Sequence, residues 1–387
     1  MKKLLLIGFA FVFGLVLVAC DEVTTAAPTT AQPTTQAPTT AAPTTVAPTT
    51  VAPTTVAPTT VAPTTTQEPV ELAELYSGTH TVTSGMAAGT VYNYHMSFIE
   101  GEYEFYCEFE MMGENYDFYE FGVYTLVDSV LTITPDEGEA LAGVFNVDAS
   151  IEVSIKPSEM AIRAVQTLTP FEGDLELNEF YRGSHTVTSG MAAGTVYVYQ
   201  MMFDDGEFEF GSNFVMMGEL YQYVEAGTYS VVGNVLTITK GEDAPIVGTI
   251  HVNGDINIVI TPSSMSTPAE HELLPIDNLD LADSFSGTHT VTEGMAAGTV
   301  YEYTITFTDG NYAFRSDYEM MATPYFYEEA GTYEFEGNVL TLTPTGGVAV
   351  TGTIQVNGNI EAPIKPSTQG ERALRMMSPV VEEEPVE

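Results

Sequence analysis

Apolar and polar residues alternate along much of the chain with a period of two, which is typical of β-strands that bury one face. One run places four large apolar residues on the same side of a strand: Tyr92, Tyr94, Met96 and Phe98. The next run repeats the pattern with Tyr103, Phe105, Cys107, Phe109 and Met111. In a later copy of the first run the opposite side reads Glu302, Thr304 and Thr306, so this side is expected to face water.

Short turn sequences separate these runs. Glu100-Gly101, Asp205-Gly206 and Asp309-Gly310 stand where a two-residue hairpin needs positive φ angles. Gly233-Asn234 and Gly337-Asn338 predict another hairpin, and Asn253-Gly254 and Asn357-Gly358 predict the last, with Asp128-Ser129 and Asp148-Ala149 at these places in the first copy. No amphipathic helix of useful length interrupts the runs. We therefore expect seven or eight short antiparallel strands in a meander, which buries one face by closing into an up-and-down barrel.

The same stretch occurs three times. HTVTSGMAAGTVY begins at His80 and returns at His185, and at His289 it returns with glutamate in place of its serine. A period of about one hundred residues is that of a whole domain and exceeds the repeat length of a solenoid. The sequence predicts an all-β chain with three tandem barrels at residues 71–157, 178–262 and 282–366, linkers at 158–177 and 263–281, and an acidic, disordered tail at 367–387.

The N-terminal residues have the pattern of a secretory signal. Lys2 and Lys3 precede an apolar run that ends in Leu17-Val18-Ala19-Cys20. The last four residues resemble the lipobox of bacterial lipoproteins, which implies cleavage after residue 19 and a diacylglycerol thioether on Cys20; an ordinary signal peptide is the alternative. Residues 20–70 then repeat Thr, Pro and Ala with a proline at every fifth position from 28 to 63, which predicts a disordered, extended stalk.

The second half of each module resembles small bacterial lipocalin-like (calycin-type) domains. The segments that carry the resemblance are residues 227–239 (GTYSVVGNVLTIT) and 331–343 (GTYEFEGNVLTLT), each followed by Gly-Thr-Ile and a final strand. The first copy departs from it with Phe121-Gly122-Val123-Tyr124 in place of Ala-Gly-Thr-Tyr. The resemblance implies an up-and-down barrel that sometimes binds an apolar ligand inside, and it implies no catalytic residues.

The amino-acid composition argues against some classes of partner and cofactor. The formal net charge of −43 makes a nucleic-acid partner very unfavourable, because its phosphates would be repelled. With Cys20 lipidated, Cys107 has no partner for an internal disulfide, and Ser212 and Ser316 replace it in the other copies. No EF-hand-like or other metal-ligand spacing occurs, and we expect neither a metal nor a cofactor.

One histidine and one glutamate recur in every module. His80, His185 and His289 share a face with Val82, Val187 and Val291, so we expect them to point inward, in the core or at the barrel mouth. Glu120, Glu225 and Glu329 each precede a glycine by two residues, which predicts a bulge that turns the carboxylate towards the histidine. Such a His–Glu pair would be a structural clamp, a ligand-orienting pair or, as the last alternative, a general acid/base pair.

Two groups of methionines also recur. The loop Gly85-Met86-Ala-Ala-Gly89 is identical in all three copies, and its methionines Met86, Met191 and Met295 are candidates for a binding edge. Recent duplication is the alternative explanation of this identity. The pairs Met111-Met112, Met216-Met217 and Met320-Met321 stand at a strand end and are expected to fill the core beside aromatic residues.

These features predict a lipid-anchored protein on the extracytoplasmic face of the cell membrane. We expect three weak sites on one tether to act as a multivalent binding protein for a polysaccharide or a host surface protein. The alternatives are a small apolar ligand inside the barrels, a surface coat or spacer without a specific ligand, and an enzyme that uses the His–Glu pair. We favour a protein without catalytic activity, because no nucleophile recurs beside that pair.

Overall fold

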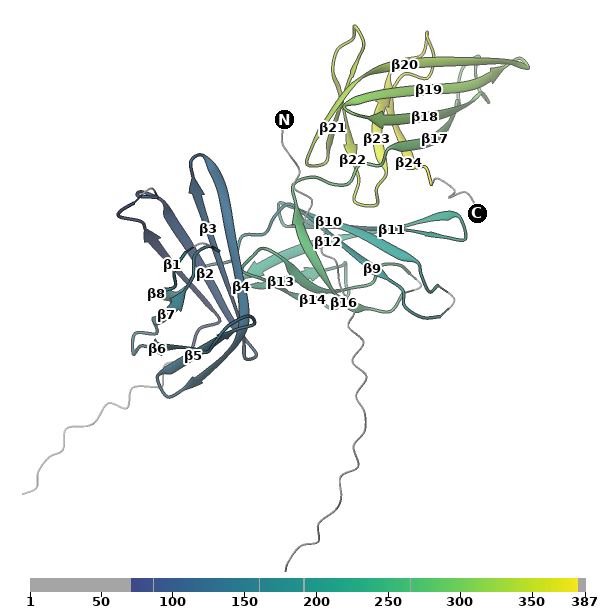
Figure 1. Ribbon diagram of the computed structural model, residues 1–387. Helices are drawn as coiled ribbons and strands as arrows, with labels where there is room; N and C mark the ends of the chain where they lie inside the picture. Colours follow the sequence, from purple (N-terminus) through teal and green to yellow (C-terminus); the bar gives the residue numbers. More distant parts are fainter. Residues whose placement is uncertain (1–70, 86, 160, 191, 265, 382–387) are drawn as a thin grey trace, which may run out of the picture. The chain divides into compact units, whose positions relative to one another are not determined.

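A computed structural model of the chain describes residues 71–381, apart from residues 86, 160, 191 and 265. The expected signal peptide, Cys20 and the stalk lie outside the described residues, as do Met86, Met191 and residues 382–387. The described part folds into three closed antiparallel barrels of eight strands each (Figure 1), which confirms the predicted fold class. It contains no helix long and apolar enough to cross a membrane.

The strands follow one another in chain order around each barrel. Those of the first barrel are β1 Leu75–Thr81, β2 Val91–Ile99, β3 Glu102–Met111, β4 Glu114–Val127, β5 Val130–Pro135, β6 Leu141–Phe145, β7 Ile151–Ile155 and β8 Ala164–Pro170. Those of the second are β9 Phe180–Thr186, β10 Val196–Asp204, β11 Glu207–Met216, β12 Glu219–Val232, β13 Val235–Thr239, β14 Ile246–Ile250, β15 Ile256–Ile260 and β16 Ala269–Ile276. Those of the third are β17 Ser284–Thr290, β18 Val300–Thr308, β19 Asn311–Met320, β20 Thr323–Glu336, β21 Val339–Pro344, β22 Val350–Ile354, β23 Ile360–Ile364 and β24 Ala373–Pro379.

The eighth strand extends each barrel past its expected boundary. β8 lies within the expected linker 158–177, β16 within 263–281, and β24 within the expected disordered tail. Each pairs with both the seventh and the first strand and thereby closes the barrel. Apolar and polar residues alternate only weakly in these eighth strands, since each strand has a single deeply buried residue: Leu168, Leu273 or Met377. The boundaries were wrong because barrel closure is a non-local requirement that the local pattern does not show.

Each barrel interior is filled by large side chains from the predicted inward face. In the first barrel these include Tyr94, Met96, Tyr103 and Phe105, all almost completely buried. The predicted turns are also present: Glu100 and Gly101 both have positive φ, as do Asp205 with Gly206 and Asp309 with Gly310. Because these two-residue turns fix the register, every alternate residue of β2 and β3 faces the core.

Candidate functional site

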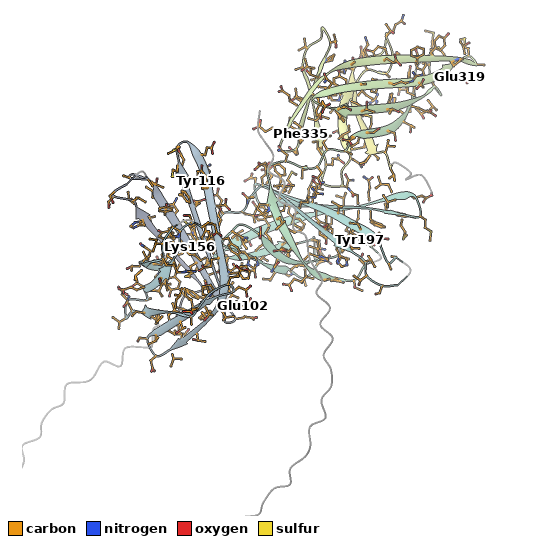
Figure 2. The ribbon with its side chains drawn as sticks, viewed as in Figure 1. Glu102, Tyr116, Lys156, Tyr197, Glu319 and Phe335 are labelled. Atoms are coloured by element: carbon orange, nitrogen blue, oxygen red, sulfur yellow. The ribbon has the colours of Figure 1, made fainter. Side chains whose placement is uncertain are left out.

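Each barrel has an end at which its first and third connections lie together. Successive strands run in opposite directions, so the β1–β2 loop, residues 82–90, and the β3–β4 turn, Met112-Gly113, share one end of the first barrel. We call this end the mouth. Figure 2 labels Tyr116 near the mouth and Glu102 at the opposite end of the same β3–β4 hairpin.

The β3–β4 hairpin forms the tall wall of the mouth. β3 pairs with the first part of β4, up to Val123, whereas β5 pairs with β4 only from Gly122 onwards. The two neighbours therefore overlap only at residues 122–123, and the outer part of the hairpin is not covered by β5. The long strands β12 and β20 change partners in the same way, at Thr228 and at residues 331–332.

A row of aromatic rings crosses this wall on the inward face. In the first barrel the ring centroids of Tyr92 and Phe109 are 4.7 Å apart, and those of Phe109 and Tyr116 are 5.4 Å apart. The row recurs as Tyr197, Phe214 and Tyr221 in the second barrel and as Tyr301, Tyr318 and Tyr325 in the third. Its outermost ring is open to solvent in the first and third barrels, where Tyr116 is 40% exposed and Tyr325 is 46% exposed, whereas Tyr221 is half-buried.

The three histidines stand at the start of these rows. His80 is opposite Tyr92 in the β1–β2 register, and His185 and His289 are opposite Tyr197 and Tyr301. His80 and His185 are exposed, and His289 is half-buried. The structure therefore places them at the mouth, and the alternative of a core position is wrong. The ring of His185 lies 5.4 Å from that of His271, and Nε2 of His289 lies 3.3 Å from Nη2 of Arg375.

The expected His–Glu pair does not form. Glu120 lies opposite Phe105 in an unbroken register, so its carboxylate faces inward without the predicted bulge. His80 lies level with Tyr92, Phe109 and Tyr116 in the register of the first four strands. Glu120 is two inward-facing positions further along β4 from Tyr116, away from the mouth. The histidine and the glutamate therefore lie at different levels of the barrel. The glycine two residues later has another role: a Cβ on Gly122 would overlap the carbonyl oxygen of Thr134 on β5.

A cation and a tyrosine hydroxyl hold each of these glutamates. Glu120 pairs with both terminal guanidinium nitrogens of Arg163, Nη1 and Nη2, and accepts a hydrogen bond from the Tyr103 hydroxyl at 3.1 Å. Glu225 pairs with Nζ of Lys240 at 3.0 Å and accepts from Tyr223 at 2.8 Å.

In the third barrel Glu329 pairs with Nη2 of Arg372 at 2.5 Å and accepts from Tyr312 and Tyr327. The glutamate side chains in all three barrels are about nine-tenths buried. Beside the first pair, Phe118, Pro135 and Lys156 help to line a hollow of about 290 Å³. This buried pairing is what the recurring glutamates share.

The residue that supplies the cation for the buried glutamate stands at a different sequence position in the second barrel than in the first and third. Arg163 and Arg372 immediately precede the eighth strand, where the second barrel has Pro268. Lys240 immediately follows the fifth strand of the second barrel, and the corresponding residues of the other barrels are prolines, Pro135 and Pro344. Sequence reasoning missed these cations, although an alignment of the three copies already contains this exchange of proline and cation.

The backbone conformation explains the two glycines of the recurring loop at residues 85–89, 190–194 and 294–298. Gly85, Gly89 and their counterparts all have φ between +79° and +96°, a region that side-chain-bearing residues rarely adopt. The loop is closed by a hydrogen bond from the Gly89 amide to the Val82 carbonyl at 2.8 Å. The side chain of Met295 is fully exposed at the corresponding loop of the third barrel.

The second methionine of each Met-Met pair lies at the hairpin tip, and the prediction that it fills the core is wrong. Met112, Met217 and Met321 are 87%, 93% and 95% exposed. Their φ angles are +59°, +56° and +52°, so each occupies a turn position that favours Asn or Gly. The following residue is Gly113, Gly218 or Ala322, and Ala322 also has a positive φ, of +58°. The third barrel therefore has the same turn with a different second residue, and the methionine is common to all three.

Cys107 and the acidic residues offer little chemistry. Burial raises the pKa of the Cys107 thiol to about 12, which keeps it protonated and unreactive. Among the described residues no group of three or more His, Cys, Asp or Glu side chains is arranged to hold a metal ion.

Comparison of the chain with protein-family models, with characterised proteins and with solved structures finds no significant match.

Proposed function

We propose that this chain is a lipid-anchored cell-surface protein that presents three lipocalin-like barrels as a multivalent binding protein. Cys20 carries the lipid, and the Thr/Pro stalk separates the barrels from the membrane. The basis for the anchor is the lipobox sequence, and the basis for multivalency is that one mouth architecture recurs three times in one chain.

The exposed methionines of the hairpin tips carry this proposal. A methionine at positive φ is less favourable than asparagine or glycine, and its exposed side chain contributes little to the stability of the barrel. The third barrel has Ala322 in place of the turn glycine but has the same methionine, so duplication alone is a poor explanation for the methionine. A contact with a partner explains why an unfavourable residue persists at the most exposed point of each mouth.

The chemistry of the mouth favours a basic protein surface as the partner. Methionine side chains are flexible and polarisable and adapt to irregular protein surfaces. Acidic residues flank the tips, with Glu110 and Glu114 beside Met112 and Glu319 beside Met321, and the whole chain is strongly negative. A cationic surface with apolar groups complements both features, and the net charge accelerates its approach at low salt.

The test exchanges the three tip methionines for the residue that the turn prefers. The variant Met112→Asn, Met217→Asn, Met321→Asn is expected to be at least as stable as the parent, because asparagine adopts the positive φ of these positions more readily than methionine does. The full chain with Cys20→Ser is passed over immobilised lysozyme and cytochrome c, both basic proteins, and over a neutral polysaccharide. A control variant replaces Val127 and Val232, which are exposed at the opposite barrel end, with asparagine.

We expect the tip variant to lose binding to the basic proteins while the control variant retains it. Equal binding by both variants would refute the role of the methionine tips. Selective binding to the polysaccharide would replace the protein partner with a glycan. The anchor is tested separately: Cys20→Ser is expected to move the protein from the membrane fraction to the soluble fraction.

A further inference from the structure

The third barrel contains three buried polar atoms that make no hydrogen bond of good geometry: the Tyr303 hydroxyl, the Ser316 hydroxyl and Nε of Arg375. Buried polar groups are almost always paired, because an unpaired one loses its bonds to water without replacement. Tyr303 is only 2% exposed and Ser316 is completely buried. Three such groups in one barrel indicate a site that takes a polar ligand.

These groups come together from three strands. Tyr303 on β18 lies directly opposite Ser316 on β19 in the register, so both side chains are on the inward face. Arg375 on β24 lies beside His289 of β17, with 3.3 Å between Nη2 and Nε2. The Tyr303 hydroxyl lies close to the Arg375 guanidinium without a well-aligned hydrogen bond, and this neighbour moderates the increase in the Tyr303 pKa that burial causes.

Arg375 is also unusual in its charge environment. The other lysines and arginines of the described residues each contact a carboxylate or an aromatic ring. In a chain with 53 acidic and 10 basic residues, a half-buried guanidinium without a carboxylate is conspicuous. Burial and the nearby Arg375 charge lower the pKa of His289, which favours the neutral imidazole beside the guanidinium.

The second barrel pairs the two corresponding hydroxyls, and the first barrel lacks two of the three groups. In the second barrel the Tyr199 hydroxyl bonds to Nδ1 of His271 at 2.8 Å, and the Ser212 hydroxyl donates to the carbonyl of Pro262. In the first barrel Cys107 and Gln166 stand in place of the serine and the arginine. The unpaired set is therefore a property of the third barrel, whereas its fold is shared.

We propose that the mouth of the third barrel binds a small organic carboxylate with an apolar body. The guanidinium of Arg375 donates to the carboxylate oxygens, and the hydroxyls of Tyr303 and Ser316 supply further donors. The neighbouring Tyr301, Tyr318 and Tyr325 rings offer a face on which an aromatic ring or the apolar face of a sugar can stack. This site is distinct from the methionine tips and does not depend on the proposed multivalent binding.

The experiment titrates the full chain carrying Cys20→Ser with sodium benzoate and, separately, with sodium glucuronate, at constant ionic strength. Binding is followed by calorimetry and by ligand-observed NMR. The key variant is Arg375→Gln, which introduces the residue type of the first barrel at this position and should leave the fold intact. The matched control is Arg315→Gln, which changes the net charge equally but removes an exposed arginine paired with Asp317 and Glu328.

We expect saturable binding of at least one acid and a loss of at least about tenfold in affinity in Arg375→Gln, with the control unchanged. Benzoate binding would indicate that the ligand is a free aromatic acid. Selective glucuronate binding would indicate that the ligand is an acidic sugar. No saturable binding up to about 20 mM of either acid, or equal weakening in both variants, would overturn the proposal.

A second variant separates binding from structure. Tyr303→Phe removes one unpaired buried hydroxyl, so it is expected to leave the stability of the third barrel unchanged or to increase it. The same change is expected to weaken carboxylate binding several-fold, because a donor to the ligand is lost. Reduced stability with unchanged affinity would assign the hydroxyl a structural role and contradict its place in the site.

Discussion

The buried glutamates show at the level of single residues how a polar group is tolerated inside a barrel. Burial acts to raise the pKa of Glu329, but hydrogen bonds from Arg372, Tyr312 and Tyr327, together with the Arg372 charge, outweigh it. The pKa of this carboxyl is therefore below its ordinary value of about 4.5. The ionised carboxylate is the form that the third barrel binds and stabilises.

This pKa direction predicts a stability change in acid. A depressed pKa contributes stability that is fully present above the ordinary glutamate value and is lost as the pH falls through the lower folded value. We expect hydrogen exchange across residues 284–379 to accelerate below about pH 4.5, and less so in Glu329→Gln. At pH 7 the same variant is expected to lose about 1–3 kcal/mol, because Arg372 loses its charged partner. An unchanged pH profile in Glu329→Gln would show that other carboxyls govern the acid response.

The inward positions of the strands could be read from the sequence, but the partners of these glutamates could not. Strand alternation specifies which face a side chain is on, and it placed Tyr94, Phe105 and their counterparts correctly. The contact between Glu120 and Arg163 joins residues on β4 and beside β8, which only barrel closure brings together. The predicted His–Glu pair was wrong because strand alternation shows that both side chains face inward but does not show how far each one lies from the mouth of the barrel.

At the level of secondary-structure elements, the fourth strand of each barrel has to pass closely over the fifth. A Cβ at Gly227 would overlap the carbonyl oxygen of Thr239 and press on the Phe208 ring. Gly227→Ala is therefore expected to destabilise the second barrel by at least about 1–3 kcal/mol, since a backbone oxygen cannot rotate away. Urea unfolding monitored by hydrogen exchange measures the loss, with the exposed neighbour Thr228→Ala as the control. Equal stability of the two variants would show that the strands separate more easily than their packing indicates.

The exchange of cation and proline between two connections predicts a compensating pair of mutations. Lys240→Pro should destabilise the second barrel by about 1–3 kcal/mol, because Glu225 is left buried without a cation. Pro268→Arg introduces the arginine of the other two barrels and should have little effect alone. The double variant should recover most of the lost stability in a double-mutant cycle. Strictly additive effects would mean that the introduced arginine does not reach Glu225.

For the whole molecule, the dominant feature is the net charge of −43. Repulsion among unpaired carboxylates disfavours compact domains, and salt screens it over about 10 Å at 0.1 M ionic strength. We expect the melting temperature at pH 7 to rise by several degrees between about 10 mM and 300 mM NaCl. Sodium sulfate at equal ionic strength separates screening from salt-specific effects. A fall with NaCl would indicate that the buried ion pairs, not the surface repulsion, dominate the response.

Three mouths on one chain predict binding that weakens disproportionately as mouths are removed. A tethered second mouth meets its target at an effective concentration in the millimolar range, so each engaged mouth multiplies the lifetime of the complex. Variants with one, two or three tip methionines changed to asparagine are compared on a dense surface of a basic protein and on the same protein at low density. We expect roughly tenfold or greater steps in dissociation rate on the dense surface and small, additive changes at low density. Equal steps at both densities would mean that the barrels bind singly, and the proposed multivalency would then be wrong even if the methionine tips form the contact.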